Sequence, residues 1–144
     1  MIKTASIVTV LIIFAGVYYD ARATEREGCV VCGMYLDLYE KTKYIVYFNN
    51  NTSKSICSLA CAAVVIDENK GSIKNIMAAD FLTGELIDAR KAYYVEGSDI
   101  PGVMSYVSRL AFLSKKQAAA FRKKHGGRII SFEGALKNQL KDKK

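Results

Sequence analysis

The sequence predicts an α+β protein made of two small, similar modules, preceded by an N-terminal signal segment. Short runs of β-branched and aromatic residues recur beside helical apolar spacing in both halves of the chain, which is the first observation behind this prediction. The second is continuity, because the chain has one proline, Pro101, and no long repeat or low-complexity linker. A length of 144 residues, 51% of them hydrophobic, suits one compact domain or two small modules and excludes a large multidomain enzyme.

The first half of the chain predicts a hairpin followed by a helix. Residues 44–48 (YIVYF) are β-branched and aromatic, which indicates a strand, and the Asn-Asn-Asn-Thr run at 49–52 indicates the turn after it. We expect a helix over 58–68, because Ser58 suits the N-cap and apolar residues follow it at helical spacing. Gly71 lies just beyond the expected end of this helix.

The second half predicts further strands and two helices. Two strand-like runs, 74–81 and 86–95, are separated by a Thr-Gly pair that suits a turn. Ser114 suits the N-cap of another helix, which two consecutive glycines close. The elements expected in this region, in order, are a short apolar run at 110–113, a helix at 115–125, a strand at 128–132 and a helix at 133–140.

The N-terminal segment has the pattern of an export signal. Lys3 supplies a positive charge, residues 5–19 are uncharged and mostly apolar, and Ala21-Arg22-Ala23 forms an A-x-A cleavage site. The apolar run is shorter than the roughly 20 residues that a membrane-spanning helix needs.

We therefore expect residues 1–23 to be a signal peptide or an uncleaved signal anchor. The rest of the chain divides into a first module, 24–73, which carries the cysteines, and a second module, 74–144, which carries a basic end. This arrangement predicts a periplasmic or other extracytoplasmic location, with membrane association if the N-terminal segment stays attached.

The positive charge is concentrated at the end of the chain. Residues 115–144 contain ten lysines and arginines against Glu133 and Asp142, in a chain of net charge +7. Such an end docks on an acidic partner or an anionic membrane, or is simply solvated. We expect no nucleic acid partner, because no recognition helix or RNA-binding motif is readable.

The cysteines form two pairs at metal-ligand spacing. Cys29 and Cys32 make a C-x2-C pair whose tight turn is relieved by Gly33, and Cys57 and Cys61 make a C-x3-C pair. If a helix begins near Cys57, both sulfurs of the second pair lie on one side of its first turn. The positive end of the helix dipole favours thiolates there.

Three readings of these cysteines are open. Four thiolates in tetrahedral geometry indicate structural zinc, whereas an oxidising compartment favours disulfides and a binding domain without metal. The third is a soft-metal transfer site, because Met34 follows Cys32 by two residues and thiolate with thioether selects Cu(I).

The chain shows no arrangement of residues typical of an enzyme. The single histidine, His125, stands at the end of an expected helix before two glycines, where a capping or solvated role is expected. Glu96 and Asp99 fall in an expected polar loop with no partner for acid–base catalysis. We therefore expect a protein without catalytic activity.

Several stretches of the sequence resemble the NosL family, accessory proteins of nitrous oxide reductase that act as copper chaperones. The resemblance covers most of the chain after the signal segment. It is carried by Cys29–Met34 (CVVCGM), Ala89–Ser105 (ARKAYYVEGSDIPGVMS), Ala111–Gly127 (AFLSKKQAAAFRKKHGG) and Ser131–Leu136 (SFEGAL).

The resemblance implies a fold, a metal and a partner. It implies a two-module ββα architecture similar to that of organomercury lyase. It also implies Cu(I) bound by Cys32 and Met34, with the loop methionine Met104 as a further ligand, and delivery to a copper enzyme such as nitrous oxide reductase.

Two features depart from the family pattern. An A-x-A site stands where many members have a lipid-carrying cysteine, and Cys57 and Cys61 are additional to the Cys-x-Met site. With Cys29 and Cys32 they are similar in spacing to TRASH and YHS-type metal-binding domains, which keeps zinc open as the ion. The expected function is an exported Cu(I) metallochaperone serving a copper enzyme or copper transporter. The alternative is a structural zinc-binding, treble-clef-like protein-interaction module.

Overall fold

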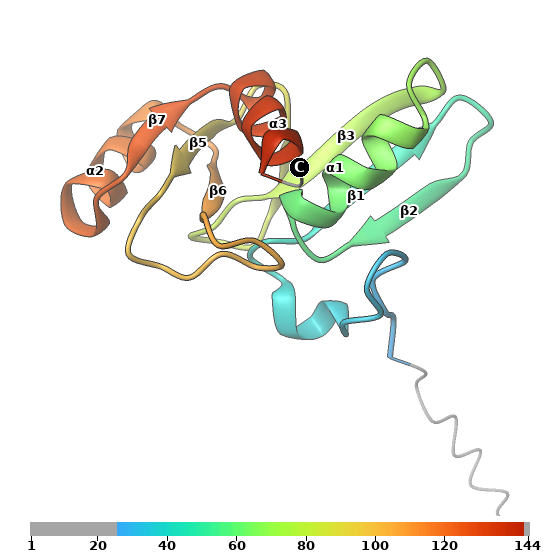
Figure 1. Cartoon of the computed structure of the whole chain (residues 1–144), viewed down its shortest axis with the longest axis horizontal. Coiled ribbons are helices and arrows are strands. Elements are labelled where there is room, and N and C mark those ends of the chain that lie inside the picture. The colour runs from blue at the N-terminus through green and yellow to red at the C-terminus, as the bar shows by residue number, and fades with distance from the viewer. Residues whose placement is uncertain (1–25, 143–144) are drawn as a thin grey trace, which may run out of the picture.

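The computed structural model describes residues 26–142, which form an α+β fold of two antiparallel sheets and three α-helices (Figure 1). The expected signal segment, residues 1–23, lies outside the described residues. Within residues 26–142, no helix is long and apolar enough to cross a membrane.

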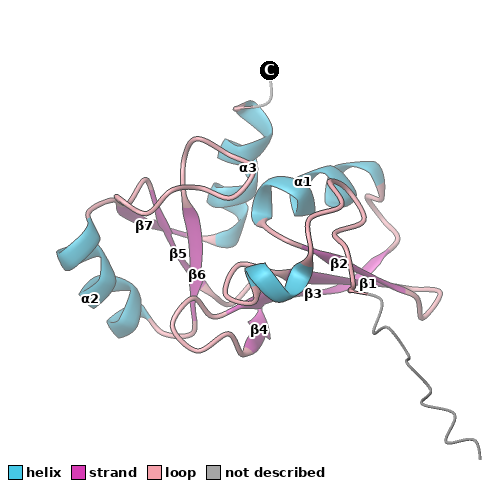
Figure 2. Ribbon diagram, turned by 90° about the horizontal axis from the view of Figure 1, so that it is seen from below, coloured by secondary structure: helices cyan, strands magenta, loops and turns pink. Residues whose placement is uncertain are grey.

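The first sheet has four strands in the order β2-β1-β3-β4, all paired antiparallel. A short 3-10 helix, η1, precedes it, and α1 packs against β1 (Figure 2). Alternate residues of β1 are buried, because successive side chains of a strand point to opposite faces. The elements are η1 Leu36–Tyr39, β1 Tyr44–Phe48, β2 Ser53–Ile56, α1 Leu59–Glu68, β3 Ile73–Ala79 and β4 Leu86–Asp88.

The second sheet has three strands in the order β6-β5-β7, and it is covered on both faces. Val95 and Leu110 pack with the buried side of α2, whereas their neighbours Tyr94 and Ala111 belong to the core shared with α3 and the first module. The elements are β5 Tyr93–Glu96, β6 Arg109–Phe112, α2 Lys115–His125, β7 Arg128–Ile130 and α3 Phe132–Lys141.

The two sheets are built on the same plan. Each begins with an antiparallel hairpin, continues into a helix, and returns with a strand that pairs antiparallel with the first strand of the hairpin. The series are β1-β2-α1-β3 and β5-β6-α2-β7, with β4 and α3 as additions. This confirms the predicted α+β fold of two similar ββα-type modules.

The division between the two sheets differs from the expected boundary at residue 74. β3 pairs with β1, and β4 pairs with β3, so the first sheet extends to Asp88. The expected strand at 86–95 is interrupted, because the Asp88 carbonyl accepts the N–H groups of Lys91 and Ala92 in a turn. Local strand propensity does not reveal that the two halves of this run belong to different sheets.

The expected helices are present, and Ser114 caps α2, whereas Ser58 stands at the N-cap position of α1 without a side-chain capping hydrogen bond. In α2 the Ser114 side chain accepts the Gln117 N–H while the Gln117 side chain reaches back to the Ser114 N–H, which is a capping box. His125 ends this helix, stacks on Phe121 and contacts Asp99 through Nδ1 at 2.9 Å. The predicted capping or solvated role fits this position at the helix C-terminus.

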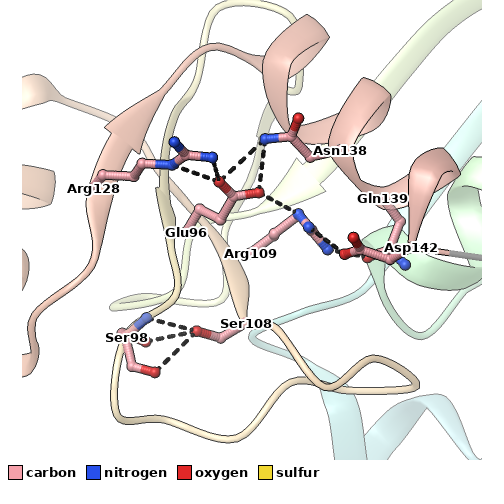
Figure 3. A network of polar contacts seen from close by, with 8 residues as sticks. All are labelled: Glu96, Ser98, Ser108, Arg109, Arg128, Asn138, Gln139 and Asp142. Carbon is pink, nitrogen blue, oxygen red and sulfur yellow. Dashed lines mark hydrogen bonds and ion pairs between the residues drawn. The ribbon is translucent and has the colours of Figure 1, made fainter.

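A buried ionic network ties the second sheet to α3 (Figure 3). Glu96, which the sequence placed in a polar loop, is 5% exposed at the end of β5. Arg109 of β6 donates to its carboxylate at 2.7 Å, and Arg128 of β7 donates at 2.8 Å. Asn138 of α3 donates to both carboxylate oxygens. Burial alone would raise the pKa of Glu96, but these hydrogen bonds and the positive charge of Arg109 lower it below its ordinary value.

Candidate metal centre

The four cysteine sulfurs converge on one point between the turn at residues 29–34 and the start of α1. All four lie within 4.8 Å of one another, with Cys32 and Cys57 at 3.5 Å and Cys57 and Cys61 at 3.8 Å. Four thiolates held tetrahedrally at the usual bond length of about 2.3 Å would be about 3.8 Å apart. The cysteines are free thiols, so the sulfurs can converge on a single ion.

A closed turn presents the first cysteine pair. The Cys29 N–H donates to the Met34 carbonyl at 2.8 Å, and the Gly33 N–H donates to the Cys29 carbonyl at 2.8 Å. Gly33 has a φ of 75°, a conformation that glycine adopts without the penalty of a side chain, as the sequence predicted. The Val30 N–H donates to the Ser55 carbonyl of β2, which fixes this turn against the first sheet.

The second pair comes from the junction of β2 and α1. The helix begins at Leu59 with Ser58 at the N-cap position, as predicted, so Cys57 stands just before the N-cap and Cys61 in the first turn. Thr42 Oγ1 donates to the Cys57 carbonyl at 2.9 Å and holds the junction. The N-cap Ser58 makes no side-chain capping hydrogen bond, in contrast to the caps of α2 and α3. The positive end of α1 therefore faces the sulfur cluster without a serine cap.

The centre is closed on most sides and accessible at one sulfur. Cys29 and Cys61 are each 3% exposed and Cys57 is 0% exposed, whereas Cys32 is only partly buried. An ion at this centre would be reached, and could be taken, through Cys32.

The surroundings of the cysteines shift the pKa values of their thiols in different directions. Burial works to raise the pKa of Cys29, but the backbone N–H groups of Cys32, Cys57 and Val31 outweigh it and lower the pKa to about 7. The side-chain hydrogen bond with Cys61, together with burial, raises the pKa of Cys57 strongly. Burial also raises the pKa of Cys32. Of these three thiols, Cys29 is thus the one that most readily becomes a thiolate in the absence of an ion.

The two methionines lie in different surroundings. Met34 is half-buried and packs against the core cluster that contains the cysteines. Met104 is 53% exposed on the loop between β5 and β6, with a φ of 55° that is uncommon outside glycine. It lines a pocket of about 640 Å³ with Tyr106 and Gln139, and no cysteine lines that pocket.

The loop that carries Met104 nevertheless reaches the start of α1. Its residues Val103 and Ser105 line a small cavity together with Ser58 and Leu59, which adjoin the second cysteine pair. The fold thus brings the four cysteines together, packs Met34 on the same core, and leaves Met104 exposed on the neighbouring loop.

Sequence reasoning missed the residues that position the sulfurs. The Thr42 hydroxyl and the Ser55 carbonyl hold the two cysteine-bearing segments in place. Neither residue has a local signal, because each contact joins positions that become neighbours only when the first sheet forms.

Comparison with known proteins identifies the family of this chain. The family model described as NosL matches residues 20–139. The copper-binding lipoprotein NosL of Stutzerimonas stutzeri is 44% identical over 50 residues, covering 35% of this chain and 26% of that protein. The HTH-type transcriptional repressor CutR of Bacillus subtilis is 24% identical over 95 residues, covering 66% of this chain and 50% of that protein. The chain thus spans half or less of the length of these two relatives.

A solved structure supports the same assignment. The crystal structure of the copper chaperone NosL from Shewanella denitrificans matches with a TM-score of 0.64 and 25% sequence identity. The match covers 74% of this chain and 87% of that one. With the family model spanning most of the sequence and the fold shared with a solved member, the chain belongs to the NosL family.

Proposed function

We propose that this protein is an extracytoplasmic metallochaperone, without catalytic activity, that binds Cu(I) and passes it to a copper protein. The observation that carries the proposal is the convergence of four free thiols within 4.8 Å, with one of them accessible. In this proposal Cys29, Cys32, Cys57 and Cys61 hold the ion.

The chemistry of the ligands favours Cu(I) as the cargo. Thiolates and thioethers are soft ligands and select Cu(I) over harder ions such as Mg²⁺ or Mn²⁺. Met34, next to the first cysteine pair, and Met104, on the adjoining loop, are the thioethers that would take the place of a cysteine sulfur in the coordination, because Cu(I) takes at most four ligands. Two relatives carry copper binding in their names, which supports the same ion.

Transfer would proceed by ligand exchange at the exposed side of the centre. A thiolate or thioether of the acceptor would attack the ion beside Cys32, which is the least buried of the four cysteines. Met104 stands exposed on a neighbouring loop and would hold the ion as the buried thiolates release it. No step requires oxidation or reduction, because the ion keeps its charge and only its ligands change.

The proposed acceptor is a copper enzyme such as nitrous oxide reductase, or a copper transporter. The proposed location is the periplasm or an equivalent compartment, with residues 1–23 as signal peptide or anchor. The Stutzerimonas relative is described as a lipoprotein, which supports a location at a membrane surface outside the cytoplasm.

One observation favours a second candidate, a structural zinc module. Three of the four cysteines are buried, and the sulfur separations suit a tetrahedral four-thiolate zinc centre. Zinc in such a centre contributes folding free energy, and its removal would unfold the first module.

Anaerobic titration of the reduced protein with Cu(I) and Zn(II) in competition distinguishes the two functions. The chaperone predicts tight Cu(I) binding at one ion per chain, unchanged circular dichroism on metal removal, and transfer of the ion to a Cu(I) chelator. Retention of zinc against Cu(I), with loss of secondary structure when zinc is stripped, would establish the structural role and overturn the proposal.

A further inference from the structure

The outward face of α2 carries the densest positive charge of the described chain. The helix buries Ala118 and Phe121 against the second sheet, and its lysines and arginines point away from that side. Its exposed cations are Lys115, Lys116, Arg122, Lys123 and Lys124. They will be called the α2 basic face.

Nothing within the described residues neutralises this face. The helix sequence KKQAAAFRKKH contains no acidic residue, and none of the five cations forms an ion pair within residues 26–142. Asp99, the carboxylate beside the end of the helix, contacts His125. These five positive charges lie on about three helical turns, in a chain whose net charge is +7.

We propose that the α2 basic face docks this protein on the surface of an anionic lipid bilayer. Lysines near such a surface are attracted by the negative potential of its headgroups, by about 1 kcal/mol each. The inference is independent of which metal the cysteines hold.

The composition of the face favours lipid headgroups over a partner protein. Four of the five cations are lysines, and lysine is depleted at protein interfaces, where arginine and aromatic residues are enriched. Between Lys116 and Arg122 stand Gln117, three alanines and the buried Phe121, so the α2 basic face itself presents no large apolar side chain to a partner protein. Because Ala118 and Phe121 are buried in the protein's own core, the helix would bind at the headgroups and not insert.

The position of α2 is compatible with a working metal centre. In both views α2 forms the far end of the second module, with the second sheet between it and α3 (Figures 1 and 2). The cysteine centre belongs to the first module, near η1 and the start of α1. Docking through the α2 basic face would therefore leave Cys32 open to an acceptor.

Vesicle sedimentation with the full chain tests the proposal. Binding is measured on vesicles of phosphatidylcholine alone and on vesicles with equal parts of phosphatidylglycerol, at about 0.1 M salt, where screening is moderate. The ratio of the two affinities isolates the electrostatic contribution, because any apolar binding by residues 5–19 is present in both. We compare the natural chain with a triple variant, Lys116→Gln, Lys123→Gln and Lys124→Gln.

The matched control removes the same charge from the first module through Lys41→Gln, Lys70→Gln and Lys74→Gln, all at exposed positions. We expect the α2 variant to lower the preference for anionic vesicles roughly 100-fold, at about 1 kcal/mol per lysine, and the control to leave it nearly unchanged. Equal losses in both variants, or no preference for anionic vesicles in the natural chain, would overturn the proposal. So would binding of duplex DNA at the same salt with an affinity equal to that for the anionic vesicles.

Discussion

The Sγ atom of Cys32 lies 3.5 Å from the Sγ atom of Cys57, although 25 residues separate them in the sequence. One sulfur comes from the closed turn at the start of the described chain and the other from the end of the first hairpin. An ion held by both would fasten the turn at 29–34 to the start of α1.

Replacing Cys32 by Ser should abolish tight Cu(I) binding with little effect on the free energy of unfolding of the metal-free protein. The side chain is partly exposed, and a serine fills nearly the same volume. Competition with a colorimetric Cu(I) chelator measures the affinity, and urea unfolding measures the stability. Retained affinity in this variant would remove Cys32 from the ligand set.

Replacing Met104 by Leu should slow the transfer of Cu(I) to a chelator while leaving the fold intact, because the side chain is exposed and leucine removes only the thioether. Stopped-flow measurement of the transfer rate checks this. Met77→Leu is the control, since Met77 lies within β3 and accepts a hydrogen bond from Asn75. If both variants transfer at the natural rate, Met104 has no part in handling the ion.

The buried network around Glu96 predicts how stability depends on pH. The folded-state pKa of Glu96 is lowered, so the ionised side chain stabilises the folded protein. This stabilisation is fully present above the ordinary glutamate pKa of about 4.3 and is lost as the pH falls below that value and through the lowered folded-state pKa. Glu96→Gln should lower the stability at pH 7 and flatten the decline at acid pH. Urea unfolding of both proteins between pH 3 and 7 measures the difference. Parallel curves would show that Glu96 titrates as it does in the unfolded chain.

Replacing each of two adjacent glycines by alanine should lower the stability of the protein by different amounts. Both have positive φ, 75° at Gly126 and 85° at Gly127, so each substitution incurs backbone strain of about 1–3 kcal/mol. A Cβ at Gly126 would meet nothing within 4 Å, whereas one at Gly127 would lie 2.5 Å from the Glu96 carbonyl oxygen. Gly127→Ala should therefore be clearly the more destabilising in thermal unfolding. Equal losses of stability would mean that the β5–β7 backbone shifts freely.

Local patterns in the sequence predicted most elements of the fold. The strand at 44–48, the turn after it and the helices that begin after Ser58 and Ser114 form where the local pattern indicates, although only Ser114 caps its helix with its side chain. The division of 86–95 between two sheets was not predictable, because it depends on which strand each half pairs with. The burial of Glu96 was missed for a similar reason, since its partners Arg109, Arg128 and Asn138 come from three separate elements.

The candidate cysteines could be predicted from the sequence, whereas the residues that hold them in place could not. The spacing of the two pairs marked all four as candidate ligands and left open whether they share one centre, and in the structure the four sulfurs converge. Met104 came from family resemblance, and the structure leaves it exposed on a separate loop. The contact of Thr42 with the Cys57 carbonyl requires the folded sheet and has no counterpart in a sequence pattern.

The repeated ββαβ plan places a helix start at the corresponding point of each module, and the two helix starts are capped differently. In the second module Ser114 follows β6 and caps α2 with its own hydroxyl, so the start of this helix needs no further partner. At the corresponding point of the first module Cys57 and Ser58 follow β2, and the serine does not close the helix. The second module thus needs no bound ion to complete its helix start. In the first module the positive end of α1 faces the four sulfurs, where a metal–thiolate cluster would complete it. An acceptor could then remove the ion while the second module stays folded.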